Sequence, residues 1–190
     1  SCISRAYLDW NRTAHGLGTL SGAEVLHAVA VDTLKGAISE LKSQLTRPIS
    51  ADEFDLWHRT ICNSLEEVYR RHGHRLYVGQ AQKWVNMSLK YVYTFGETRL
   101  AGFSDAYHLC HIPLDSIIIG HLAKYGLPKI SSSWSRMKDY TEYLDRQVWI
   151  RRRFVQAPLD VEFLLWIGGD TGMRSLGLGG PRLNETGPSL

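Results

Sequence analysis

The sequence has few cysteines, and the three among its 190 residues lie far apart without a C-x-x-C pair: Cys2, Cys62 and Cys110. An odd number at wide spacing argues against a disulfide framework, so we expect a protein of the reducing cytoplasm. The histidines nearest to Cys110 do not complete a recognised zinc-ligand spacing with it: His108, His111 and His121. We therefore predict no bound metal and no other cofactor.

Long apolar runs are also missing. The most apolar stretch, residues 117–119, soon reaches His121 and Lys124, whereas a helix needs about 18–20 apolar residues to span a bilayer. The first residues lack the basic-then-apolar order of a secretion signal. We expect no membrane partner.

Sustained alternation of apolar and polar residues with hairpin turns, which indicates β-strands, is absent too. Neither charge sign dominates, because 22 Lys and Arg oppose 19 Asp and Glu, for a formal net charge of +3. This balance permits a polyanionic partner without requiring one. The hydrophobic content of 44% and charged content of 22% are those of an ordinary globular protein.

Apolar residues recur at helical spacing along most of the chain. Ser50 and Glu53 form a capping-box pattern at the start of one predicted helix, and Gly73 is suited to its end. The expected helices cover about residues 3–14, 21–46, 50–72, 79–95, 113–126, 134–152 and 159–167, with a loop or broken helix over 97–112. We predict an all-α fold of seven or eight helices, with residues 1–168 forming one domain of one or two lobes. A flexible tail rich in Gly and Pro follows over 169–190.

The stretch most suggestive of chemistry contains a lysine behind a glycine turn. Gly79 precedes the predicted helix, and Lys83 follows within about one turn, beside Trp84. A helix N-terminus and apolar neighbours are the features that activate an amine as a nucleophile. Lys83 is therefore a candidate nucleophile.

A candidate partner follows 115 − 83 = 32 residues later, in Ile112-Pro113-Leu114-Asp115. Proline favours the first turn of a helix, and a carboxylate at a helix start is held by backbone N–H groups. Asp115 is thus placed to stabilise a developing positive charge.

These two motifs resemble the helix-hairpin-helix DNA glycosylase superfamily, in particular its archaeal and bacterial 8-oxoguanine glycosylase-like branches. The likeness covers roughly residues 76–120, with Gly79 and Lys83 at the hairpin and nucleophile positions and Asp115 at the aspartate position. The family hairpin usually carries two glycines, and this chain has one there. An all-α fold agrees with the superfamily.

The resemblance implies base excision from double-stranded DNA by a monomer associated with the nucleoid. The damaged nucleotide, such as one bearing 8-oxoguanine, is flipped out of the duplex. Lys83 displaces the base and forms a Schiff base with the sugar, while Asp115 stabilises the charge and β-elimination can nick the strand. Substrate-binding candidates beside Pro113 and Gly79 are Gln80, Gln82, Trp84, Trp149 and Trp166. Candidates for phosphate contacts are Arg70, Arg71, Arg75, Lys90, Arg151, Arg152 and Arg153.

Simpler interpretations stay open. Lys83 can be a solvated surface lysine, and Asp115 a plain helix cap. The chain can also be a helical nucleic-acid-binding or interaction module without catalysis. Arg71 and His74, in the run Arg70-Arg71-His72-Gly73-His74, suggest a third possibility, a metal-independent helical RNase.

Overall fold

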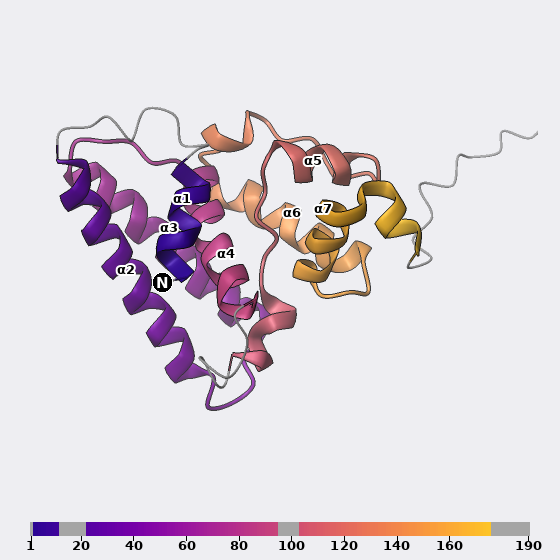
Figure 1. The fold of residues 1–190 in the computed structure, drawn as a ribbon, viewed down its shortest axis with the longest axis horizontal. Helices are drawn as coiled ribbons and strands as arrows, with labels where there is room; N and C mark the ends of the chain where they lie inside the picture. Colours follow the sequence, from indigo (N-terminus) through magenta and orange to yellow (C-terminus); the bar gives the residue numbers. More distant parts are fainter. Residues whose placement is uncertain (1, 12–21, 95–102, 176–190) are drawn as a thin grey trace, which may run out of the picture.

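The computed structural model describes residues 2–11, 22–94 and 103–175 (Figure 1). Its α-helices are α1 (Cys2–Asn11), α2 (Ala23–Gln44), α3 (Ala51–Arg71), α4 (Val78–Thr94), α5 (Ser116–Ala123), α6 (Tyr140–Arg153) and α7 (Pro158–Ser175). Two short 3-10 helices are η1 (Ser104–Leu109) and η2 (Trp134–Arg136). No strand occurs among these residues, so the predicted all-α class is confirmed. Within the same ranges, no helix has both the length and the apolar character needed to cross a bilayer.

The local signals at both ends of α3 act as expected. The Ser50 side chain accepts a hydrogen bond from the Glu53 N–H, and the Glu53 carboxylate accepts one from the Ser50 N–H. This capping box satisfies backbone donors that the first turn leaves without partners. After His72, Gly73 adopts a φ of 76°, a conformation that glycine tolerates better than other residues. The chain then turns toward α4.

Helix α4 is the centre of the molecule. It packs against α1 and α3 and also contacts α6 and η2, and in Figure 1 it lies between the N-terminal helices and the α5–α7 group. Every residue from Val78 to Asn86 is buried, including the polar side chains of Gln80, Gln82 and Lys83. A helix buried all round is usually apolar, so each of these polar groups requires a partner inside the protein.

The start of α4 differs from the predicted glycine turn. The helix begins at Val78, so Gly79 lies inside its first turn, where its N–H donates to the Met137 carbonyl at 3.2 Å. A Cβ at Gly79 would lie 1.6 Å from the Trp134 carbonyl oxygen. Glycine is required here because η2 approaches the helix backbone closely. The Gly79 N–H is used by the Met137 carbonyl and does not point at a phosphate.

Three other helix boundaries also differ from the predictions. Pro113 precedes α5 without joining it, because Asp115 is the N-cap. Helix α6 starts at Tyr140, because the Asp139 carboxylate caps it by accepting from the Thr141 N–H; residues 134–139 are therefore not part of it. Helix α7 continues to Ser175, beyond the predicted tail boundary at 168. Residues 12–14 and 21 of the first two predicted helices, 97–102 of the predicted loop and 176–190 of the predicted tail lie outside the described residues.

Substituting Gly79 tests the close approach of η2. We expect Gly79→Ala to lower the free energy of unfolding by about 2–3 kcal/mol, because the new methyl group overlaps backbone atoms of Trp134. Gly36→Ala is the matched control: it lies in α2 with open space around its Cα and should stabilise the protein by about 0.5–1 kcal/mol. Urea denaturation measures both, and equal effects would contradict the contact.

Candidate functional site

Lys83 and Asp115, which are far apart in sequence, form a buried ion pair. Lys83 Nζ donates to Asp115 Oδ2 at 3.1 Å, and the two residues are 7% and 8% exposed. Asp115 Oδ1 accepts from the N–H groups of Ile117 and Ile118, at 3.0 Å each. Asp115 therefore caps α5 with one oxygen and binds the amine with the other.

The face of α4 that carries Lys83 also borders a cavity of about 430 Å³. Met87, Lys90 and Tyr91 line the cavity with Lys83, at the i+4, i+7 and i+8 spacing of one helix face. Other walls come from Pro113, Asp115, Ser116 and Ile117 near the start of α5, Glu162 and Trp166 of α7, Trp134 of η2 and Asp9 of α1. The volume falls in the range of small-molecule sites.

Trp134 covers the amine from a second side. Lys83 Nζ lies 4.9 Å from the centroid of the Trp134 ring, within the distance at which a cation is attracted to an aromatic face. The contact depends on the close approach of η2 to Gly79. The sequence placed Trp134 in a long helix and gave no signal for this role.

A second lysine–carboxylate pair lines the same cavity. Lys90 Nζ lies 2.7 Å from Glu162 Oε1 and 4.6 Å from the centroid of the Phe163 ring. Burial raises the pKa of the Glu162 carboxyl, although Lys90 opposes this shift. Nearby, the Tyr91 hydroxyl donates to Asp9. The cavity thus combines charged pairs with aromatic walls.

Behind the site, buried polar side chains form a hydrogen-bonded network. Asn86 Oδ1 accepts from His58 Nε2 at 2.9 Å, and Asn86 Nδ2 donates to the Tyr143 hydroxyl at 2.8 Å. That hydroxyl contacts His111 Nδ1 at 2.9 Å, and His111 Nε2 contacts Asp55 Oδ1 at 2.8 Å. The chain of bonds connects α4 with α3, α6 and the segment before Asp115.

The titration of this network follows from its burial. Burial lowers the pKa of His111 to about 4, despite its hydrogen bond to Asp55. For Asp55, burial acts to raise the pKa of the carboxyl, but His111 and Arg151 outweigh it and hold that pKa below its usual range. His111 is consequently neutral near pH 7, and Asp55 pairs with the Arg151 guanidinium at 2.7 and 2.9 Å.

Of the predicted substrate contacts, Pro113 and Trp166 line the cavity. Trp84 does not, because it points toward α1 and stacks on Trp10 with ring centroids 5.0 Å apart. Trp149 of α6 packs edge-on against Phe154, the residue after that helix. Residues on neighbouring positions of a helix point about 100° apart, which separates Trp84 from Lys83.

The predicted amide contacts are also occupied elsewhere. The Gln80 side chain accepts from the Tyr77 N–H at the start of α4, and Gln82 binds the backbone of Leu114. Together with Gly79, which faces η2, these residues lie away from the cavity. They shape the site and do not line it.

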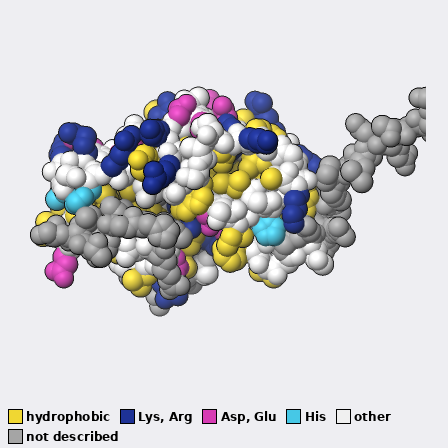
Figure 2. Space-filling model, turned by 90° about the horizontal axis from the view of Figure 1, so that it is seen from above, with side chains coloured by type: hydrophobic (Ala, Val, Ile, Leu, Met, Phe, Trp, Pro, Cys, Tyr) yellow, Lys and Arg dark blue, Asp and Glu magenta, His cyan; other side chains and the backbone are white. Residues whose placement is uncertain are grey.

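The Arg and Lys residues predicted to contact phosphates differ in whether they form ion pairs and in whether they are exposed. Arg151 holds Asp55, and Lys90 holds Glu162, so both are used inside the protein. Arg70 and Arg71 both bind Glu67. Arg70 and Arg71 are nevertheless exposed, as are Arg75, Arg152 and Arg153. On the face in Figure 2, Lys and Arg side chains form separate groups among acidic and apolar ones.

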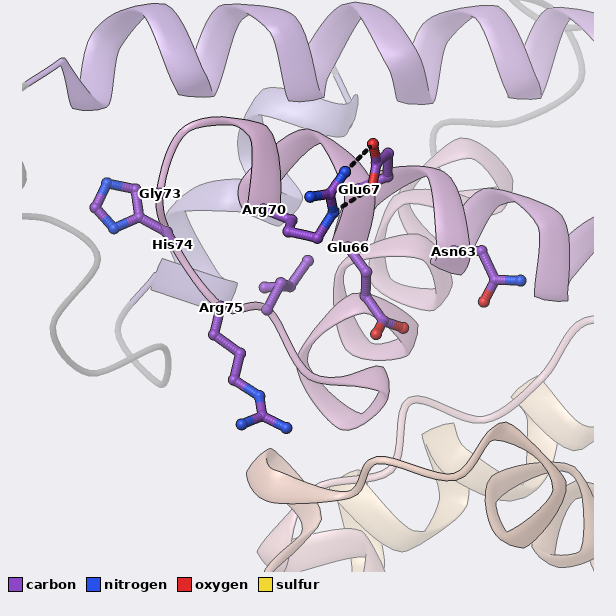
Figure 3. A pocket seen from close by; sticks show the side chains of 8 residues that line it. Asn63, Glu66, Glu67, Arg70, Gly73, His74 and Arg75 are labelled. Carbon is purple, nitrogen blue, oxygen red and sulfur yellow. Dashed lines mark hydrogen bonds and ion pairs between the residues drawn. The ribbon is translucent and has the colours of Figure 1, made fainter.

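Another cavity, of about 650 Å³, lies at the end of α3 (Figure 3). It contains His74 of the predicted RNase pair, whereas Arg71 is not among its walls. In Figure 3 the His74 ring points away from Glu66. The structure therefore does not bring Arg71 and His74 together around one cavity. Burial raises the pKa of Glu66 to about 7, although Arg75 opposes this shift.

The described residues contain no group of three His, Cys, Asp or Glu side chains arranged to hold a metal ion. Comparison of the chain with protein-family models, curated proteins and solved structures gives no match. The inference of function therefore starts from the geometry of the site.

Glu66 gives one pH-dependent prediction. Because the pKa of Glu66 is raised by folding, wild type should lose stability relative to Glu66→Gln as the pH rises from about 4.5 to about 7. The side chain is only half-buried, so solvent screening should limit the loss to about 1 kcal/mol. Thermal melts across this range measure it.

Glu67→Gln is the control for Glu66. Hydrogen bonds to Arg70 and Arg71 lower the pKa of Glu67 to about 2, so its contribution should stay constant between pH 5 and 8. A flat profile for Glu66→Gln relative to wild type would contradict the buried position of Glu66.

His111 gives a prediction of opposite sign. Its pKa falls from 6.5 to about 4 on folding, so its neutral form stabilises the protein above pH 6.5, and this contribution is lost as the pH falls toward 4. The stability advantage of wild type over His111→Gln should therefore shrink by up to about 3 kcal/mol across that interval. Urea titrations at several pH values test this, and a constant difference would refute it.

Proposed function

We propose that this protein is a DNA glycosylase with associated lyase activity, acting on an oxidised purine such as 8-oxoguanine. The observation that carries the proposal is the Lys83–Asp115 pair, with 3.1 Å between Nζ and Oδ2, at the wall of a cavity of about 430 Å³. Charged groups that are buried beside a cavity are frequent at functional sites, because burying them has an energetic cost.

The two simpler interpretations explain less of the geometry. A solvated lysine does not fit Lys83, which is 7% exposed. Asp115 is a helix cap, but a cap uses one carboxylate oxygen, and the other binds the amine. The pair joins two elements at the place where a substrate can enter.

In the proposed reaction, a nucleotide flipped out of the duplex inserts its base into the cavity. Trp134 and Trp166 supply aromatic surface for stacking, and the Lys90–Glu162 pair supplies a donor and an acceptor for the base edge. Such groups distinguish bases by their polar atoms, as base-flipping enzymes require.

The chemistry begins when Lys83 Nζ loses a proton to solvent, while Asp115, the group in contact with it, stays a carboxylate. The free electron pair of Nζ attacks C1′, the C1′–N bond breaks, and its electrons leave with the base, which takes up a proton. The carboxylate stabilises positive charge at the sugar during this step. Opening of the C1′–O4′ bond gives the Schiff base, and loss of a C2′ proton expels the 3′ phosphate.

Borohydride trapping tests the nucleophile. Wild type incubated with a duplex containing 8-oxoguanine should give a covalent protein–DNA adduct after reduction, and Lys83→Gln should give none. Lys90→Gln is the matched control, because Lys90 lines the same cavity with its own carboxylate. It should still be trapped, at a lower rate, because it loses a proposed base contact and keeps the nucleophile. Duplex binding without an adduct on any oxidised purine would instead indicate a non-catalytic DNA-binding module.

The substitution Asp115→Asn distinguishes the helix-capping role of Asp115 from the role of its negative charge. Asparagine caps helices about as well as aspartate, so the α5 cap should be kept, and any drop in melting temperature should come from the buried Lys83 amine that loses its anionic partner. Removal of the negative charge from the reacting centre should lower the single-turnover excision rate by about 10²-fold or more. Unchanged excision with a folded variant would reduce Asp115 to a structural cap.

A further inference from the structure

The side chain of Gln82 uses its full hydrogen-bonding capacity at one place. Its Nε2 donates to the carbonyls of Gly79 at 2.9 Å and Leu114 at 2.8 Å. Its Oε1 accepts from the Leu114 N–H at 3.2 Å and from Asn86 Nδ2 at 3.0 Å. A carboxamide offers two donors and two acceptor positions, so Gln82, which is 1% exposed, has none left for a substrate.

The residues that this amide joins are the neighbours of the proposed catalytic pair. Gln82 immediately precedes Lys83, and Leu114 immediately precedes Asp115. The amide binds both the N–H and the carbonyl of Leu114, as a residue of a paired strand would. Two bonds to one residue fix its orientation as well as its distance, which a single bond does not.

Gln147 of α6 makes the equivalent contact two residues earlier in the chain, at Ile112. Its Oε1 accepts from the Ile112 N–H at 3.0 Å, and its Nε2 donates to the Ile112 carbonyl at 2.9 Å. Pro113 lies between the two bound residues. Because alternate residues of a paired strand bond to the same side, the missing N–H of proline leaves both contacts intact.

We propose that Gln82 is a positioning residue that sets the placement of Asp115 against Lys83, an inference that rests on the function proposed above. The Gln82 amide fixes the Leu114 peptide to the first turns of α4, and the chain then delivers the Asp115 carboxylate to the amine. Gln147 anchors the same segment farther from the reacting atoms. A purely structural role predicts equal consequences for both glutamines, and a positioning role predicts a difference.

The decisive comparison is Gln82→Met against Gln147→Met, since each removes the bidentate contact of a buried amide with one backbone residue. Gln82→Met also removes the bonds to Gly79 and Asn86. Both should lower the melting temperature. Gln82→Met should also lower the single-turnover excision rate by about 10- to 100-fold with DNA affinity retained, because small misplacements of reacting groups have effects of this size. Gln147→Met should stay within about threefold of wild type, by the same reasoning.

Gln82→Glu is the second variant, in case Gln82→Met does not fold. It keeps an acceptor for the Leu114 N–H and Asn86 but loses the donor to the Leu114 carbonyl. It should show the same selective loss of excision rate. Equal rates for the Gln82 variant that folds and for Gln147→Met would overturn the proposal.

A measurement independent of DNA separates this inference from the proposed function. Reductive methylation with formaldehyde and cyanoborohydride, quantified at Lys83 by peptide mass spectrometry, reports how firmly Asp115 holds the amine. Methylation of Lys83 should be faster in the folded Gln82 variant than in wild type, and unchanged in Gln147→Met. If wild type excises no base, the comparison of Lys83 methylation rates alone tests the positioning role of Gln82. Equal methylation rates in the two variants would refute that role.

Discussion

An amine buried in the central helix of an all-α protein needs an anion beside it, and this requirement determines much of the surrounding structure. Lys83 lies on a stretch of α4 in which every residue is buried, so water cannot compensate its charge. The anion comes from Asp115, 32 residues later, at the end of residues 110–115, which belong to no helix. Positioning of that segment is therefore the central structural problem.

Two glutamine side chains position this segment by making the hydrogen bonds that a neighbouring β-strand would make. Gln82 and Gln147 each bind both polar groups of one backbone residue, at Leu114 and Ile112. In an all-α fold no strand is present among the described residues to do so, and unpaired backbone groups in the core are costly. Asn86 then links Gln82 to the buried histidines, so the core network and the site share one set of hydrogen bonds.

Local signals made a large part of this predictable from sequence. The capping box of Ser50 and Glu53 and the helical class follow from short-range patterns, and the described residues confirm both. The resemblance paired Lys83 with Asp115, and the two side chains are in contact, while their catalytic roles stay a prediction. The predictions were wrong where the role of a residue depends on the direction in which its side chain points. Trp84 is adjacent to Lys83 in sequence but faces α1, and recognising this requires the helix faces to be assigned.

The contacts of η2 could not be predicted from local sequence patterns. The sequence predicted a glycine turn before the lysine helix, but in the structure the absence of a side chain at Gly79 makes room for the Trp134 backbone. Nothing near Gly79 in sequence indicates a partner 55 residues away, since 134 − 79 = 55. The spacing of Lys83, Met87, Lys90 and Tyr91, by contrast, is visible in the sequence and would have identified the cavity face.

Two lysine–carboxylate pairs on that face raise the question of which amine reacts. Burial raises the pKa of Glu162, the partner of Lys90, whereas two backbone N–H groups of α5 stabilise the carboxylate of Asp115. A carboxylate fixed by two backbone N–H groups is the better placed to stabilise positive charge in the proposed reaction. Lys83 also lies under Trp134, so the amine is fixed from two sides. These differences favour Lys83 as the nucleophile and leave the Lys90–Glu162 pair to recognise the base.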